Sequence, residues 1–130
     1  MQQAAAKSGD WIVAQADIHM VQPSGPSNPY AAPLPFAGRL DGGLSADVFF
    51  DGEPAATQGS RATNQAKHMA PPGCSFVRQP ENKGQVMGGS ASVYVNKKPV
   101  ARHDDQAQTC ADPVPNGAAK VKAVGTVFAG

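Results

Sequence analysis

Five side chains in this sequence could bind a soft or borderline metal ion, namely the three histidines and two cysteines, His19, His68, His103, Cys74 and Cys110. A structural zinc site takes four nitrogen or sulfur ligands in a tetrahedron, and three histidines with one cysteine would complete it. His103 and Cys110 lie close together in the sequence, but that spacing is far less specific than paired Cys-x-x-Cys motifs. Each histidine could also be a surface or turn residue, and each cysteine a small buried apolar side chain. The residue types therefore permit a metal site without placing it.

An enzymatic site has less support in the sequence. A cysteine nucleophile with a histidine base needs an orienting carboxylate, for which Asp104, Asp105 and Asp112 are available, but no local motif joins these groups. A catalytic zinc keeps one coordination position open and works beside a general base. The two glutamates, Glu53 and Glu81, both lie in turn-like contexts. We therefore expect no enzymatic activity, and a zinc-dependent hydrolase is the least favoured function.

The composition predicts one small all-β domain that spans residues 1–130. Fourteen glycines and 12 prolines in 130 residues, with only 16% charged residues, disfavour helices and suit short strands joined by tight turns. The net charge of +1 gives no reason to expect nucleic acid as a partner. The first ten residues contain no apolar run, so we expect synthesis in the cytoplasm without a signal peptide and reduced thiols rather than a disulfide.

An internal repeat indicates that the domain is built from copies of one β-element. The segment Gly43–Thr57 returns as Gly88–Arg102, with conservative pairs such as Phe49 with Tyr94. Further strands are expected at Trp11–Gln22, as one strand or a kinked pair, and as a closing strand at Val121–Phe128.

Turn and loop signals divide the rest of the chain. Asp41-Gly42-Gly43 predicts a hairpin between Phe36–Leu40 and Ala46–Phe50, and Asp51-Gly52 and Asn96-Lys97-Lys98 predict two more turns. The proline-rich segment 23–35 is expected to be an extended surface loop.

Several of these motifs together resemble the PAAR-repeat family. They are Gly9-Asp10 followed by His19, the two Pro-Ala-Ala-Arg-like turns Pro54-Ala-Ala-Thr57 and Pro99-Val-Ala-Arg102, the following Asp105, and Thr109-Cys110-Ala-Asp-Pro113. The stretches 35–45, 62–68 and 125–130 look most like the PAAR-like branch found with phage-tail-like particles and some type VI secretion clusters. This chain departs from the family pattern at Thr57, which replaces the arginine of the first repeat.

The resemblance implies a fold and a metal. Members of the family form a small cone of short strands and hairpins, with a zinc ion that holds the apex together. Iron would also suit histidine and cysteine ligands. Carried over to this chain, the implied ligands are His19, His68 and Cys110. His103 is the expected fourth ligand, and Cys74 is the alternative.

The resemblance also implies a partner and a location. The protein would cap a trimeric β-helical spike, one tip per trimer, sharpen it for membrane puncture, and travel outward at the tip of the particle after assembly. The strands that carry Phe49 and Tyr94 are the expected contacts with the spike. The alternative function is an adaptor that docks an effector or toxin cargo onto the spike through the proline-rich loop.

Overall fold

The structure is a computed structural model that describes residues 2–130, and it is all-β. None of these residues forms a helix that could cross a membrane. The strands are β1 (Gln3–Ala4), β2 (Trp11–Pro23), β3 (Tyr30–Gly42), β4 (Phe49–Phe50), β5 (Glu53–Pro54), β6 (Arg61–Asn64), β7 (Cys74–Phe76), β8 (Lys83–Val86), β9 (Tyr94–Val95), β10 (Lys98–Pro99), β11 (Gln106–Thr109), β12 (Asn116–Lys122) and β13 (Phe128–Ala129).

Six strands close into a small antiparallel barrel in the order β12, β11, β8, β6, β3 and β2, and the pairing of β12 with β2 completes the ring. Closure leaves no open sheet edge within the barrel wall. The interior is filled by small and medium apolar side chains, of which Ile12, Phe36, Leu40 and Val86 are the largest. This confirms the predicted fold class, a small all-β domain built from short strands and hairpins.

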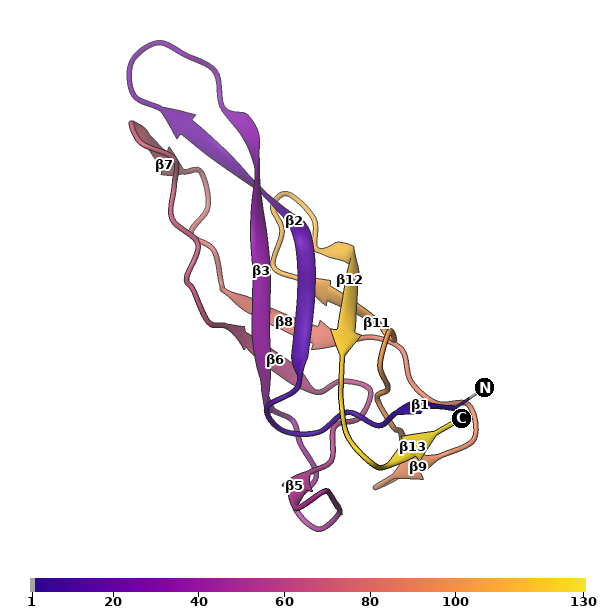
Figure 1. Cartoon of the computed structure of the whole chain (residues 1–130). Helices are drawn as coiled ribbons and strands as arrows, with labels where there is room; N and C mark the ends of the chain where they lie inside the picture. The colour runs from indigo at the N-terminus through magenta and orange to yellow at the C-terminus, as the bar shows by residue number, and fades with distance from the viewer. Residues whose placement is uncertain (1) are drawn as a thin grey trace.

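Strands β2 and β3 are much longer than the others, and their far halves form an arm that projects beyond the barrel (Figure 1). Their pairing runs from Trp11 opposite Arg39 out to Val21 opposite Tyr30, and β7 adds to the outer end of β2. The expected strand at Trp11–Gln22 is confirmed, and it contains an irregularity in pairing between Ala14 and Asp17.

The proline-rich segment is shorter as a loop than expected. Residues 30–35 belong to β3, so only residues 24–29 connect the two strands of the arm. Pairing of β3 with β6 begins at Gly38, which leaves the outer part of β3 as an edge. Pro33 and Pro35 are exposed there and need no backbone donor, because proline is tolerated on an edge strand.

The predicted hairpin between Phe36–Leu40 and Ala46–Phe50 is wrong. Residues 36–40 pair with β2 and β6 instead, and β4 pairs with β5 across the Asp51-Gly52 turn. A later turn signal thus closes the hairpin in place of Asp41-Gly42-Gly43. The expected closing strand is also split, because β12 ends at Lys122 and β13 begins at Phe128.

Three small hairpins cover one end of the barrel, and we call this end the hairpin end (Figure 1). Two of them, β4–β5 and β9–β10, are the repeat found in the sequence, with the positive-φ turns Asp51-Gly52 and Asn96-Lys97. The third is formed by β13 and β1, so the two ends of the chain meet in it. Phe49, Tyr94 and Phe128 take the same place in the three hairpins, opposite Pro54, Pro99 and Ala4.

A ring of main-chain hydrogen bonds relates the three copies beneath these hairpins. Ala6 N donates to Ala101 O at 2.8 Å, Ala101 N to Ala56 O at 3.0 Å, and Ala56 N to Ala6 O at 3.0 Å. All three alanines are fully buried. The three segments surround one axis and pack closely there, where a small side chain fits. The fold therefore has approximate threefold symmetry at the hairpin end, from a single chain.

Candidate metal centre

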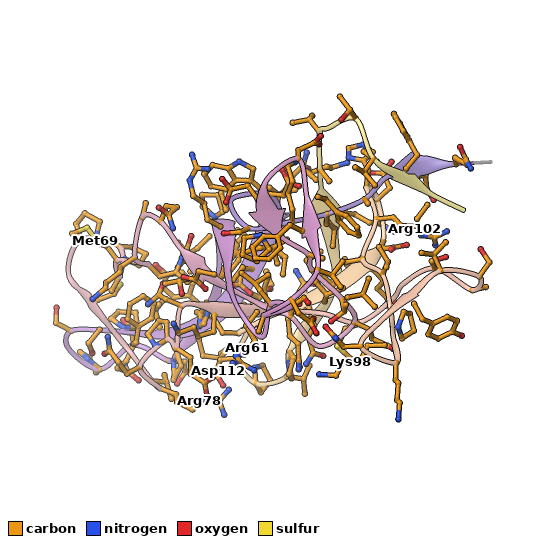
Figure 2. All side chains as sticks on the ribbon, turned by 90° about the horizontal axis from the view of Figure 1, so that it is seen from below. Arg61, Met69, Arg78, Lys98, Arg102 and Asp112 are labelled. Atoms are coloured by element: carbon orange, nitrogen blue, oxygen red, sulfur yellow. The ribbon has the colours of Figure 1, made fainter. Side chains whose placement is uncertain are left out.

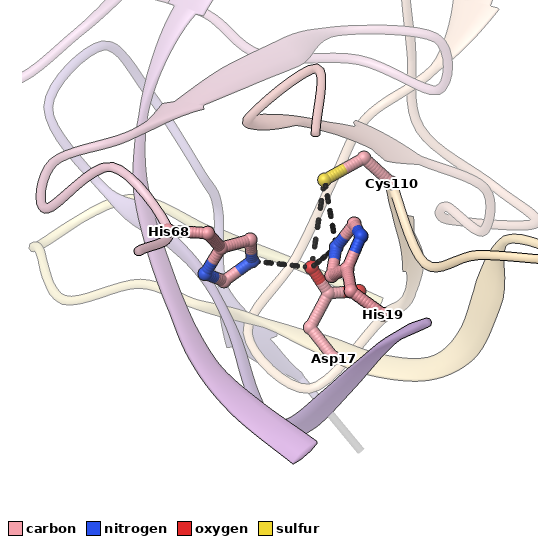
Figure 3. Close-up of side chains that lie close together, drawn as sticks. All are labelled: Asp17, His19, His68 and Cys110. Atoms are coloured by element: carbon pink, nitrogen blue, oxygen red, sulfur yellow. Dashed lines mark hydrogen bonds and ion pairs between the residues drawn. The ribbon is translucent and has the colours of Figure 1, made fainter. Parts of the chain in front are cut away.

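Four side chains from three separate segments converge (Figure 3). They lie inside the barrel, toward the end opposite the hairpins. Asp17 and His19 lie on β2, His68 follows β6, and Cys110 follows β11. One oxygen, nitrogen or sulfur atom from each lies within 4.8 Å of the others. We call these four residues the metal cluster, because this set of donors could hold a metal ion.

The irregularity in β2 is what turns Asp17 and His19 inward. Residues alternate between the two faces of a strand, and Ile12 and Ala14 are buried before the irregularity. Gln15 and Ala16 are both exposed, after which the buried positions change from even to odd numbers and include Asp17 and His19. A bulge of this kind commonly redirects side chains next to a functional site.

The distances between donor atoms centre on one carboxylate oxygen. Asp17 Oδ2 lies 2.7 Å from His68 Nε2, 3.1 Å from His19 Nε2 and 3.4 Å from Cys110 Sγ. Cys110 Sγ lies 3.7 Å from His19 Nε2. Ligands of a tetrahedral zinc ion are separated by roughly 3.3–3.6 Å, given bonds of about 2.0–2.3 Å. The cluster is thus close to the size that four ligands of one small divalent cation require.

The site is almost closed to solvent. The side chains of Asp17, His19 and His68 are 0–2% exposed, while Cys110 is half-buried. The rings of Phe76 and Phe36 lie against His19 and His68, respectively. An ion held by an aspartate and a cysteine thiolate would bring two negative ligands to a divalent cation, so the group as a whole would be neutral where an unpaired charge is costly.

The two nitrogens of the His19 ring have different surroundings. Within residues 2–130, His19 Nδ1 is buried and has no hydrogen-bond partner. A neutral imidazole carries its proton on either nitrogen. With the proton on Nδ1, the lone pair of Nε2 faces Asp17 Oδ2 and Cys110 Sγ, and a shared cation would stabilise that arrangement.

The side chains of Asp17 and His68 shift each other's pKa. Burial alone would raise the pKa of Asp17, but contacts with His68, Thr109 and His19 outweigh it and lower the pKa below 3.8. Burial likewise opposes a charged His68, yet its contacts with Asp17 and Cys110 raise the pKa of His68 to about 9. Without a metal ion, an ion pair between Asp17 and protonated His68 would compensate the buried carboxylate.

Three of the four ligands implied by the resemblance, His19, His68 and Cys110, come together in the metal cluster. His103 does not join them. It lies beside the ring at the hairpin end, where its main-chain N donates to Ala4 O and its Nδ1 accepts from Ala123 N at 3.0 Å. The turns at Ser8 and Gln58 occupy the equivalent places in the other two copies. There the main-chain N of Ser8 donates to Pro54 O, and that of Gln58 donates to Pro99 O.

The alternative ligand, Cys74, also lies elsewhere. It is in β7 on the arm, with its sulfur 3.6 Å from the hydroxyl of Tyr30. The fourth member of the cluster is Asp17, which sequence reasoning missed. An aspartate two residues before His19 on an expected strand was the available signal, since such residues share a face, but the shift of phase within β2 cannot be read from the alternation alone.

Comparison with known proteins adds no relative. No family model, curated protein or solved structure matches this chain.

The residues expected to contact a spike lie at the hairpin end, and both are accessible. Phe49 and Tyr94 are 54% and 56% exposed, and Phe128, at the equivalent place in the third hairpin, is 54% exposed. The repeat within the sequence did not reveal Phe128, because the third hairpin is divided between the two ends of the chain. We call these three side chains the aromatic triad.

Proposed function

We propose that the protein is the tip of the spike in a contractile injection machine, of the kind found in type VI secretion systems and phage-tail-like particles. In this role it caps a trimeric β-helical spike and sharpens it for membrane puncture. It would be assembled in the cytoplasm at the end of the particle and carried outward when the sheath contracts. The resemblance to PAAR repeats suggested this function, and two features of the fold now support it independently.

The approximate threefold symmetry of the hairpin end is the observation that carries the proposal. A single chain has no general reason to repeat one hairpin three times around an axis, with a ring of three alanines beneath it. Such a surface is suited to a partner with three identical chains, because each copy of the partner can meet an equivalent hairpin. Exposed aromatic side chains such as the aromatic triad are enriched among the anchors of protein interfaces.

The metal cluster supplies the second feature. At the end opposite the hairpins the strands diverge into loops and an arm, and a small domain with a limited core is often stabilised by a metal. The ion would tie β2 to the segments after β6 and β11. We propose zinc, which suits a donor set of one oxygen, two nitrogens and one sulfur, with iron as the alternative. Four protein ligands would leave no open position, consistent with a structural role.

The distribution of roles along the molecule follows from this arrangement. Force from the spike would enter through the hairpin end, and the opposite end would meet the target membrane first. A bound metal there would resist local unfolding, because metal binding is coupled to the folded state. The arm, which projects from that end, favours cargo docking as a second function (Figure 1). Cargo binding would then depend on the arm and spike binding on the hairpin end.

Replacement of each member of the aromatic triad by aspartate tests the proposal. In a pull-down with the trimeric spike protein, we expect Phe49→Asp, Tyr94→Asp and Phe128→Asp each to weaken binding by about tenfold or more, since an interface anchor typically contributes over 1 kcal/mol. Met69→Asp is the matched control, because Met69 is 80% exposed and lies well away from β10 and its Lys98 (Figure 2). Undiminished binding by all three folded variants would refute the aromatic triad as the docking surface.

A further inference from the structure

A threonine beneath the metal cluster holds the oxygen of Asp17 that the other three members do not contact. Thr109 Oγ1 donates to Asp17 Oδ1 at 2.6 Å, and both residues are buried, with 2% and 0% exposure. Thr109 lies on β11 and Asp17 on β2, and β12 separates these strands in the barrel. The bond therefore spans the interior instead of following the sheet.

This bond divides the carboxylate into two oxygens with different surroundings. Oδ2 faces His19, His68 and Cys110, whereas Oδ1 accepts the hydrogen bond from Thr109. A carboxylate can bind a metal through one oxygen or through both. An oxygen engaged by a short hydrogen bond to a buried hydroxyl is less available as a second ligand.

We infer that Thr109 is a positioning residue that restricts Asp17 to a single ligating oxygen and thereby fixes the site at four ligands. The inference rests on the metal binding proposed above and adds the element that sets its coordination number. Groups that hydrogen-bond a metal ligand orient it, and their loss typically lowers metal affinity by about 10–100-fold. Coordination number matters for selectivity, because four-coordinate tetrahedral sites favour zinc over metals that need six oxygen ligands.

Cobalt(II) provides a direct probe of this geometry, since its visible absorption is stronger in four-coordinate than in five-coordinate sites. The experiment loads the full chain with cobalt(II) and compares the native protein with Thr109→Val and Thr109→Ser. Valine keeps the shape of threonine and loses the hydroxyl, while serine keeps the hydroxyl. We expect weaker bands and about 10–100-fold lower cobalt affinity for Thr109→Val, and a native spectrum for Thr109→Ser.

A control and a second pair of variants separate positioning from packing. Thr57→Val changes a threonine that is equally buried, at 4% exposure, but lies at the hairpin end, and it should leave the spectrum unchanged. If Thr109→Val does not fold, Thr109→Ala is compared with Thr109→Ser, since both lack the methyl group and only serine retains the hydroxyl. A difference in band intensity within this pair supports the inference.

The outcomes also distinguish this inference from the metal site itself. A native protein that binds cobalt, with equal spectra and affinities in the hydroxyl-bearing and hydroxyl-free variants, would overturn the role of Thr109 and leave the metal site intact. A native protein that binds neither cobalt nor zinc would overturn both. Reduced stability of Thr109→Val with an unchanged spectrum would assign Thr109 to packing and also refute the inference.

Discussion

Asp17 is the residue on which the metal cluster depends most. Its Oδ2 lies within 3.4 Å of a nitrogen or sulfur atom of each of the other three members, and Thr109 holds its second oxygen. A buried carboxylate among two imidazoles and a thiol is costly unless its charge is compensated. Either a bound cation or a proton on His68 supplies that compensation, and the two states differ in their response to mutation and to pH.

Asp17→Asn should abolish stable metal binding, because the amide keeps the size of the side chain but removes the negative charge from the ligand set. We expect one metal ion per native chain after dialysis, and an affinity loss of more than about 100-fold in the variant, beyond that of a residue that only orients a ligand. Elemental analysis of purified protein measures the ratio. His103→Ala is the matched control and should retain one ion, since His103 lies outside the cluster. Full occupancy in Asp17→Asn, or its loss in His103→Ala, would contradict this site.

Between about pH 4 and 10, stability should depend on pH in opposite directions with and without the metal. In chelated protein, the raised pKa of His68 contributes stability that is complete below about 6.5 and is lost as the pH rises through about 9. The lowered pKa of Asp17 contributes stability that is complete above about 3.8 and is lost as the pH falls through its value in the folded protein. Metal-loaded protein should instead lose stability on acidification, because protons compete for the ligands.

Urea unfolding from pH 4 to 10, with and without chelator, measures this dependence. His68→Asn in chelator should lose the decline between pH 6.5 and 9, since the imidazole whose pKa is raised by its contacts with Asp17 and Cys110 is absent. An identical pH profile for chelated and metal-loaded protein would show that His68 is not shared between a proton and a metal.

The metal ligands could be predicted only in part from the sequence. The sequence limited the metal ligands to five histidines and cysteines, because few other side chains bind soft metals, and its resemblance to PAAR repeats implied His19, His68 and Cys110 among them. It could not exclude His103, whose turn resembles a site motif but belongs to the opposite end of the barrel. Nor could it include Asp17, which depends on the change of phase within β2.

Among the elements, turn chemistry was predicted well and strand pairing less so. The Asp51-Gly52 and Asn96-Lys97 turns form as expected, since asparagine, aspartate and glycine tolerate positive φ. The partner of Phe36–Leu40 was wrong, because pairing between distant strands is decided by closure of the barrel and leaves no local signal. The third hairpin was missed for a similar reason, as its two strands lie at opposite ends of the sequence.

In the turn Asn96-Lys97, substitution of Lys97 should increase the stability of the protein. Lys97 has φ of 69°, where its counterpart in the other hairpin is Gly52 with φ of 81°. A non-glycine residue in this left-handed region costs about 1–2 kcal/mol, and glycine recovers part of that after its own entropic cost. We expect Lys97→Gly to stabilise the protein by about 0.5–1 kcal/mol in chemical denaturation.

Lys98→Gly serves as the control for this substitution. Lys98 is the neighbouring exposed residue in β10, where glycine should destabilise by about 0.5–1 kcal/mol. Equal losses in the two variants would show that the turn does not hold Lys97 under strain.

In the whole molecule, one end is nearly symmetric and the other is not. The hairpin end repeats the same main-chain bonds three times, while the metal cluster and the arm (Figure 1) lie toward the opposite end and are not repeated there in the same way. A chain of this form can bind a partner with threefold symmetry at one end and form a single tip at the other. The threefold symmetry of the hairpin end supports the proposal of a spike tip more than any one residue does.

The stoichiometry of the complex with the trimeric spike protein tests the central proposal most directly. Native mass spectrometry of the mixture, with the tip protein in excess, counts the chains in the assembly. The threefold axis of the hairpin end predicts one copy of this chain on each spike trimer, because its three hairpins occupy all three equivalent positions. Three copies per trimer, or no complex with folded, metal-loaded protein, would contradict the account.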